Sequence, residues 1–319
     1  MRLFSFRENR YNGEGTVPLQ EKEKGVRKLI KCIATDMDGT LLNMDQTISK
    51  ENAEAIRTAR KRGVEVIVCT GRSYEGARFP LTEAGLECFL ICMNGAQIRT
   101  FDGEILSSIP LDPAIVRSVH PILEKYQIYY EMYTNKGQLS TEYEHAVATV
   151  ADILSKIGNF PSFKKVMEGV ITRFAKGKIK FVGDYGPIFS DPSYEIYKII
   201  AFSLNEEKLE RAREELQRIG GIAISSSWHN NLEITDIRAQ KGIALETFVA
   251  LKGWSLKETM AIGDNYNDVS MLERAGFSVA MGNAPEDIKK ICHYVTDTND
   301  NHGFSKAVYK ILEMNEQAI

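Results

Sequence analysis

The sequence is poor in cysteine, carries little net charge and has no long apolar run. Its five cysteines are an odd number at irregular spacings, and no zinc-ligand spacing among them is completed by histidines. Buried, reduced thiols in a cytoplasmic protein fit this pattern best. The net charge of −3 gives no electrostatic reason to expect a nucleic acid or an anionic membrane as a partner.

Other absences narrow the class of protein further. No apolar segment approaches the length of a transmembrane helix, and the first residues lack the apolar region of a signal peptide. Neither a Walker A sequence nor a dinucleotide-binding G-x-G-x-x-G is present. The composition is that of a globular protein, and a length of 319 residues suggests two domains. We expect a monomer or weak dimer.

Alternating strand and helix patterns predict an α/β unit that is split in the sequence. Residues 29–36, 64–69 and 88–93 are short apolar runs, and a helical pattern capped by Ser49 separates the first two. Strand–helix–strand order predicts a parallel sheet with helices on both faces. The same pattern resumes after residue 239, so the two parts belong to one core.

The segment between these halves has a different order of elements. The patterns predict helices and strands over residues 112–126, 128–133, 195–204, 205–219, 222–228 and 232–236. Their order is typical of an α+β module with a mostly antiparallel sheet. We therefore predict a core formed by residues 29–110 and 237–319, an inserted module at 111–236, and a flexible extension at 1–28.

Polar side chains gather where the predicted core strands end. They are Asp36, Asp38, Thr70, Gly71, Arg72, Lys241, Asp264, Asn267 and Asp268. Ligands of open α/β sheets bind outside the carboxyl ends of the strands, so these residues are expected to converge. Adjacent carboxylates resist joint ionisation unless a cation is near, and Mg²⁺ prefers carboxylate oxygens. A lysine, a hydroxyl and glycine-turn N–H groups bind anions, which favours a phosphate beside the metal.

Each of these pieces also has a simpler interpretation. An Asp-x-Asp or Thr-Gly pair after a strand is most often a turn or a helix cap. A lysine that opens a helix is usually solvated, and residues 264–268 would serve to cap the following helix. Their joint occurrence, in this order on alternating strands, favours a functional site.

The motifs resemble those of the haloacid dehalogenase superfamily of phosphatases. The resemblance rests on Asp36-Met37-Asp38-Gly39-Thr40, Thr70, Lys241 and Gly263-Asp264-Asn265-Tyr266-Asn267-Asp268. The insert resembles the C2B cap of the Cof-type subfamily, which Asn94-Gly95-Ala96 also matches. The resemblance covers residues 29–319 and implies a Rossmann-like core with a cap that selects the substrate.

The resemblance also implies a mechanism. Asp36 would attack phosphorus to form an aspartyl-phosphate, and Asp38 would protonate the leaving oxygen and then activate water. Mg²⁺ would be held by the Asp36 carboxylate, the Asp38 backbone carbonyl and Asp264, with Asp268 in support. The transferring oxygens would be bound by Thr70, Lys241 and Asn267 and by backbone N–H groups near Met37 and Gly71.

Substrate selection is expected from the insert. Alternation places Tyr129, Glu131 and Tyr133 on one face of a strand, where they would stack on a ring and bind hydroxyls. Alternatively, these tyrosines pack the strand against a cap helix. Arg72 and Asn94 are further candidates for substrate contact. The family implies sugar phosphates, nucleotides or a flavin precursor with a phosphorylated ribityl chain, and the tyrosines favour the last.

Two other functions remain open at this point. Related caps serve phosphomutases, which return the phosphoryl group to a second hydroxyl of the substrate. A regulatory or binding protein without turnover is the other alternative. The intact set of Asp36, Asp38, Lys241 and Asp264 argues against it.

Overall fold

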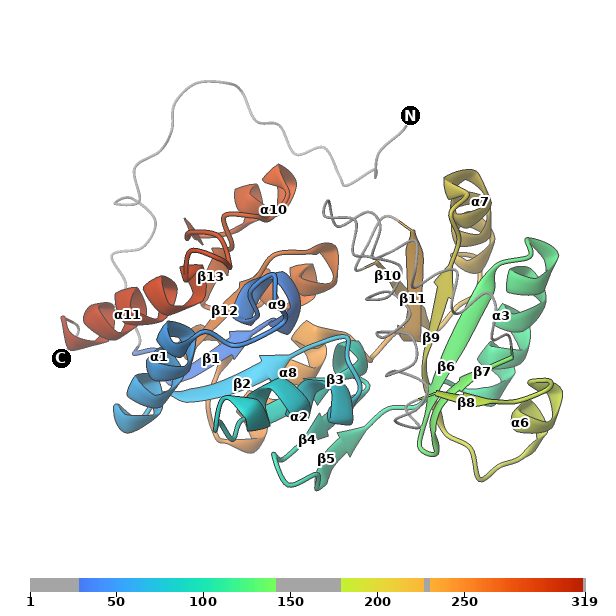
Figure 1. The fold of residues 1–319 in the computed structure, drawn as a ribbon, viewed down its shortest axis with the longest axis horizontal. Helices are drawn as coiled ribbons and strands as arrows, with labels where there is room; N and C mark the ends of the chain where they lie inside the picture. The colour runs from blue at the N-terminus through green and yellow to red at the C-terminus, as the bar shows by residue number, and fades with distance from the viewer. Residues whose placement is uncertain (1–28, 142–178, 227–229, 318–319) are drawn as a thin grey trace.

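The computed structural model describes residues 29–141, 179–226 and 230–317. The predicted extension at 1–28 lies outside this range, as do residues 142–178 of the insert and His229. Within the described residues, the chain forms one eight-stranded and one six-stranded sheet, each with its own helices (Figure 1).

The larger sheet forms the core. Its strands, in spatial order, are β14 (Tyr294–Val295), β13 (Phe277–Ala280), β12 (Thr259–Gly263), β1 (Cys32–Thr35), β2 (Glu65–Cys69), β3 (Phe89–Cys92), β4 (Gln97–Arg99) and β5 (Ile105–Ser108). The strands from β14 to β3 are parallel, whereas β3, β4 and β5 pair antiparallel. A turn at Asp102-Gly103 joins β4 to β5, with Gly103 at φ +98°.

Successive residues of the central strands pack into different layers. Ile33 of β1 lies in a cluster with residues of α1 (Lys50–Lys61), α2 (Tyr74–Glu83) and α11 (Gly303–Glu316). Its neighbours Cys32 and Ala34 lie in a second cluster, with residues of α8 (Lys241–Leu251), α9 (Val269–Leu272) and α10 (Glu286–Ile291). Because strand side chains alternate between faces, the two clusters place helices on both faces of the sheet.

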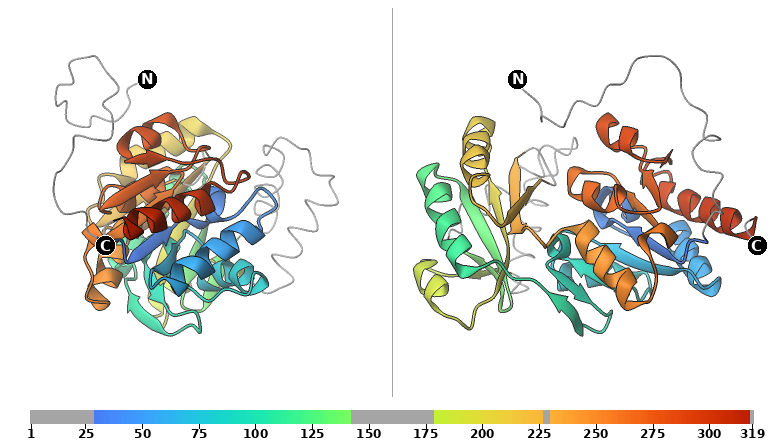
Figure 2. Two further views of the ribbon diagram at one scale, coloured as in Figure 1. Left: turned by 90° about the vertical axis from the view of Figure 1, so that its left-hand side faces the viewer. Right: turned by 180° about the vertical axis from the view of Figure 1, so that it is seen from behind.

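The six-stranded sheet comes from the insert. Its order is β10 (Ile222–Ser225), β11 (Asn231–Asp236), β9 (Ile196–Phe202), β6 (Tyr129–Thr134), β7 (Gly137–Ser140) and β8 (Ile179–Phe181). Helices α3 (Pro113–Lys125), α6 (Gly186–Ser190) and α7 (Glu206–Leu216) lie on the side away from the core (Figures 1 and 2). Tyr130 and Met132 pack against these helices, so the opposite face of the sheet is turned toward the core.

The predicted fold class is confirmed, with corrections to the insert. The prediction missed β7, β8 and α6, which are short and lack a clear apolar period. β7 and β8 pair in parallel, whereas the other described pairs of this sheet are antiparallel, in agreement with the predicted mostly antiparallel sheet. The helix expected next to residues 264–268 begins as a 3-10 turn, Tyr266–Asp268, before α9. None of the helices in the described ranges is both long and apolar enough to cross a membrane.

The contact between α8 and α9 gives a test of the core packing. A Cβ on Gly242 would lie 1.9 Å from the backbone oxygen of Ser270, a contact that only a backbone shift relieves. We expect Gly242→Ala to lower the free energy of unfolding by about 1–3 kcal/mol, measured by urea denaturation. Gly220→Ala is the matched control because its Cβ would meet nothing within 4 Å. Equal stability of the two variants would contradict this packing.

Candidate active site

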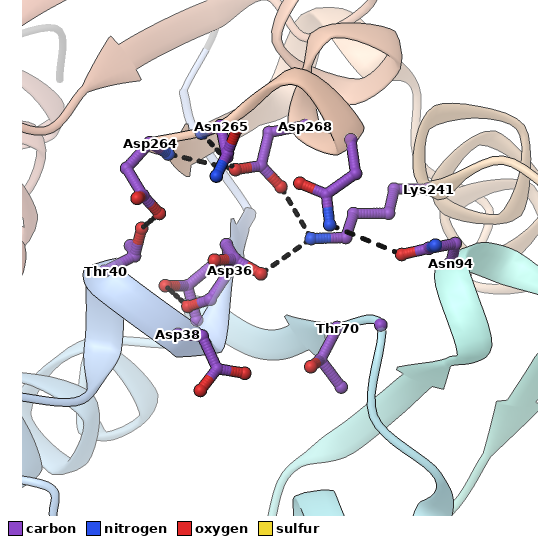
Figure 3. A network of polar contacts seen from close by, with 12 residues as sticks. Asp36, Asp38, Thr40, Thr70, Asn94, Lys241, Asp264, Asn265 and Asp268 are labelled. Carbon is purple, nitrogen blue, oxygen red and sulfur yellow. Dashed lines mark hydrogen bonds and ion pairs between the residues drawn. The ribbon is translucent and has the colours of Figure 1, made fainter. Parts of the chain in front are cut away.

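The candidate site lies at the carboxyl ends of three neighbouring core strands. Asp36 follows β1, Thr70 follows β2 and Asp264 follows β12. Lys241 is the first residue of α8, and its side chain reaches between Asp36 and Asp268 (Figure 3). Since β1 pairs in parallel with both β12 and β2, residues far apart in sequence meet at one edge of the sheet.

Lys241 is fully buried between two carboxylates. Its Nζ donates to Asp36 Oδ1 at 2.6 Å and to Asp268 Oδ1 at 2.6 Å. Burial alone would lower the pKa of Lys241, but the charges of Asp268 and Asp36 raise it above its ordinary value. Burial raises the pKa of Asp36 and the charge of Asp268 adds to this, whereas Lys241 opposes the shift. The lysine therefore favours the ionised form of Asp36.

Asp264 is held by neutral donors. Thr40 donates to Asp264 Oδ1 at 2.9 Å, and the Asn283 amide lies 3.5 Å from Asp264 Oδ2. Burial and the charge of Asp268 raise the pKa of Asp264 to about 7. Asp268 in turn accepts the backbone N–H groups of Asp264 and Asn265 at 2.9 and 3.0 Å. The motif that follows β12 is thus both a helix cap and part of a carboxylate cluster.

The carboxylate cluster fits a hard divalent cation. One oxygen from each of Asp36, Asp264 and Asp268 lies within 4.8 Å of the other two. Lys241 forms salt bridges with Asp36 and Asp268. Among the residues that the structure describes, no salt bridge reaches Asp264. Local negative charge therefore exceeds the positive charge, and carboxylate oxygens are the ligands that Mg²⁺ prefers.

Asp38 is placed apart from this cluster. Its side chain is 46% exposed and forms a bidentate salt bridge with Arg72. Arg72 Nε donates to Asp38 Oδ2 at 2.8 Å, and Arg72 Nη2 donates to Asp38 Oδ1 at 2.5 Å. Arg72 also donates to Gln46. Gly39, directly after Asp38, turns the chain at φ +75°, and a Cβ there would lie 2.5 Å from Asp264 Oδ2. Sequence reasoning missed the Arg72–Asp38 pair, because 34 positions separate the partners.

The loops after β2 and β3 are tied together beside Lys241. The backbone N–H of Asn94 donates to the Thr70 carbonyl at 3.0 Å, and that of Met93 to the Arg72 carbonyl at 2.9 Å. Asn94 has a left-handed backbone, at φ 58°, and its Oδ1 accepts from Asn267 Nδ2 at 3.4 Å. Within the described part of the chain, the buried Oδ1 of Asn267 has no hydrogen-bond partner.

The predicted substrate residues of the insert lie on the core-facing side of the second sheet. The Tyr129 hydroxyl donates to Glu131 at 2.7 Å, and Lys198 Nζ lies 4.6 Å from the centre of the Tyr133 ring. Tyr130, which lies between Tyr129 and Glu131 in the sequence, packs against helices α3, α6 and α7. Sequence reasoning missed Lys198 and Glu233, although a charged residue inside each buried strand was a usable signal.

Comparison with known proteins places the chain in a family. A family model for haloacid dehalogenase-like hydrolases matches residues 33–308, so the chain belongs to this family of hydrolases. Phosphatase YwpJ of Bacillus subtilis (strain 168) is 32% identical over 285 residues, covering 89% of this chain and 100% of the relative. YwtE of the same organism, a 5-amino-6-(5-phospho-D-ribitylamino)uracil phosphatase, is 34% identical over 284 residues, covering 89% and 98%.

Solved structures show the same fold. A haloacid dehalogenase-like hydrolase from B. subtilis has a TM-score of 0.79 at 31% identity, covering 88% of this chain and 99% of that one. A sugar phosphatase of subclass IIB has a TM-score of 0.68 at 23% identity, with the same coverage. The resemblance seen in the motifs is therefore confirmed at the level of family and fold.

The buried lysine gives a prediction on stability. Lys241→Met would leave Asp36 and Asp268 buried without their counter-charge, a change that costs about 3–5 kcal/mol of unfolding free energy. We expect that loss in denaturant titrations in the presence of a chelator, with partial recovery when Asp268→Asn is added. The control is Lys61→Met, at an exposed position of α1. A loss no larger than that of the control would show that the lysine does not stabilise the cluster.

Proposed function

We propose that the protein is a magnesium-dependent phosphatase that hydrolyses small phosphomonoesters through an aspartyl-phosphate on Asp36. The observation that supports this most is the buried Lys241 bridging Asp36 and Asp268, next to Asp264, which no salt bridge of the described residues reaches. A nucleophilic carboxylate must be ionised, and Lys241 favours ionisation where burial opposes it.

The two aspartates of the first motif divide the chemistry. An Asp36 oxygen attacks phosphorus as the ester P–O bond breaks, and Asp38 gives its proton to the leaving oxygen. Water then attacks the aspartyl-phosphate while Asp38 takes its proton, which releases phosphate and restores Asp36. The exposed carboxylate of Asp38 suits this exchange of protons, and Arg72 orients it.

Charge neutralisation and positioning come from the surrounding groups. Mg²⁺, when held by Asp36, Asp264 and the Asp38 carbonyl with Asp268 in support, would offset the negative charge of the phosphoryl oxygens. Thr70, Lys241 and Asn267, with the N–H groups near Met37 and Gly71, complete the phosphate site. The unpartnered Oδ1 and the amide of Asn267 lie beside Asn94 at its margin.

For the substrate, we propose a phosphorylated flavin precursor with a ribityl chain. Two B. subtilis relatives, YwtE and YcsE, are 5-amino-6-(5-phospho-D-ribitylamino)uracil phosphatases, at 34% and 28% identity. The hydroxyl of Tyr129 and the carboxylate of Glu131 lie on the core-facing side of the inserted sheet. They suit a substrate that carries a ring and hydroxyl groups. A relative from Escherichia coli, YbhA, is a pyridoxal phosphate phosphatase, so that ester belongs in the same panel with sugar phosphates and nucleotides.

We also propose a cytoplasmic setting. All five cysteines are free thiols, and four of them are buried. Burial raises the pKa of the Cys92 thiol to about 12, which keeps it protonated and unreactive. A reducing compartment suits such thiols.

Turnover by Asp36 is tested with a panel of phosphomonoesters in Mg²⁺ and an assay for released phosphate. We expect Asp36→Asn to lower kcat by at least about three orders of magnitude, because the covalent step is lost. Asp102→Asn, at an exposed turn, is the control and should match the wild type. Wild-type release no greater than that of Asp36→Asn would point to a non-catalytic protein, and isomerised ester without free phosphate to a phosphomutase.

The metal is tested separately. Chelation should abolish phosphate release, and added Mg²⁺ should restore it. Asp264→Asn should raise the Mg²⁺ concentration needed for half-maximal rate by about tenfold or more, because a charged ligand is lost. Calorimetric titration of Mg²⁺ into the free protein provides a readout independent of activity. A full rate in excess chelator would exclude the metal assignment.

A further inference from the structure

A buried ion pair in the inserted sheet lies against the core. Lys198 on β9 and Glu233 on β11 are 3.4 Å apart, and their side chains are 2% and 3% exposed. Glu233 stands opposite Ile200 in the register, so the two charges are diagonal neighbours on one face. That face also carries Tyr133, whose ring lies under the Lys198 ammonium.

Both charges reach the loop that follows β2. Lys198 Nζ donates to the Gly71 carbonyl oxygen at 2.6 Å, and the Asn94 amide donates to Glu233. A Cβ on Gly71 would lie 3.1 Å from Asn94 Oδ1, 3.3 Å from Glu233 Oε2 and 3.7 Å from Lys198 Nζ. The pair is therefore packed directly on the turn assigned to phosphate binding.

The contacts continue into the phosphate site. Asn94, which Glu233 engages, accepts from the Asn267 amide and holds the Thr70 carbonyl through its own backbone N–H. Three of the groups assigned to the phosphate, Thr70, Gly71 and Asn267, thus lie one or two hydrogen bonds from the ion pair. Neither charge of the pair contacts Asp36 or Lys241 in the hydrogen bonds of the described residues.

Stability does not account for this arrangement. Replacing a buried ion pair by neutral groups of similar volume is often neutral or stabilising, so such a pair is weak evidence of a structural role. The pair instead connects the inserted sheet to the turn that follows β2 in the core sheet. A displacement of about 1 Å at a reacting centre costs about a hundredfold in rate, which makes the position of this turn consequential.

We propose that Lys198 and Glu233 are positioning residues that couple the contact between the inserted sheet and the core to the geometry of the phosphate-binding turn. They act through Gly71 and Asn94, and the phosphate-binding groups reach their working positions when both contacts are made. The inference rests on the proposed phosphatase function. It assigns the pair to orientation of the phosphoryl group and not to recognition of the leaving group.

The test is the double variant Lys198→Met with Glu233→Gln, which removes both charges of the pair together. With 4-nitrophenyl phosphate as substrate, we expect kcat to fall by about 10–100-fold with KM changed less than about threefold. The control is Lys125→Met with Glu215→Gln, an ion pair of 2.7 Å between α3 and α7 on the far side of the same sheet. The control should retain the wild-type kcat.

Hydrogen exchange supplies a readout that needs no turnover. The amides of Met93 and Asn94 bond the carbonyls of Arg72 and Thr70, so their exchange reports on the turn. In the full-length double variant we expect about tenfold faster exchange at residues 92–96, with residues 50–61 of α1 unchanged. If the wild type released no phosphate but this local change appeared, the coupling would stand and the proposed function would fail.

Three outcomes overturn the inference. The first is a double variant whose kcat and local exchange both match the wild type. The second is an increase in KM alone, which would assign the pair to leaving-group binding. The third is faster exchange in α1 equal to that at residues 92–96, which would show a general structural role.

Discussion

The site depends on one buried ammonium group. Lys241 lies within 2.6 Å of both Asp36 and Asp268, and all three side chains are almost completely removed from solvent. Without that charge, a cluster of carboxylates at the end of a buried strand would be protonated or would destabilise the fold. Lys241 compensates two of the carboxylates, and the third, Asp264, is left with neutral donors, which is where a cation is most strongly favoured.

Backbone packing brings these charges together. The parallel pairing of β1 with β12 and β2 places their carboxyl ends side by side. Small residues then permit the close approach: Gly39 leaves room for Asp264, and Gly242 lets α8 start against Ser270. Catalytic geometry here is thus a consequence of sheet order and of a few positions where a side chain does not fit.

The second sheet adds a polar surface to this edge. Its helices pack on the outer face (Figure 2). Its inner face presents Tyr129, Glu131, Lys198 and Glu233. Lys198 and Glu233 meet the turn at Gly71, whereas Tyr129 and Glu131 lie on the neighbouring strand β6, where Glu131 stands opposite Ile200. In the two proposals, Lys198 and Glu233 orient the phosphoryl group, and Tyr129 and Glu131 contact the rest of the substrate.

The sequence alone determined the fold class and predicted a metal and a phosphate site at the strand ends, because both inferences rest on local patterns. Apolar runs with alternating helices indicate a parallel sheet, and residue types at strand ends indicate a metal and a phosphate. Short elements such as β7 and α6 were not predicted, because they have too few residues to show a periodic pattern of apolar side chains. The partners of Asp38 and Gly71, namely Arg72 and Lys198, were decided only by tertiary structure. Lys198 lies 127 positions from Gly71, and no local pattern carries a contact over that separation.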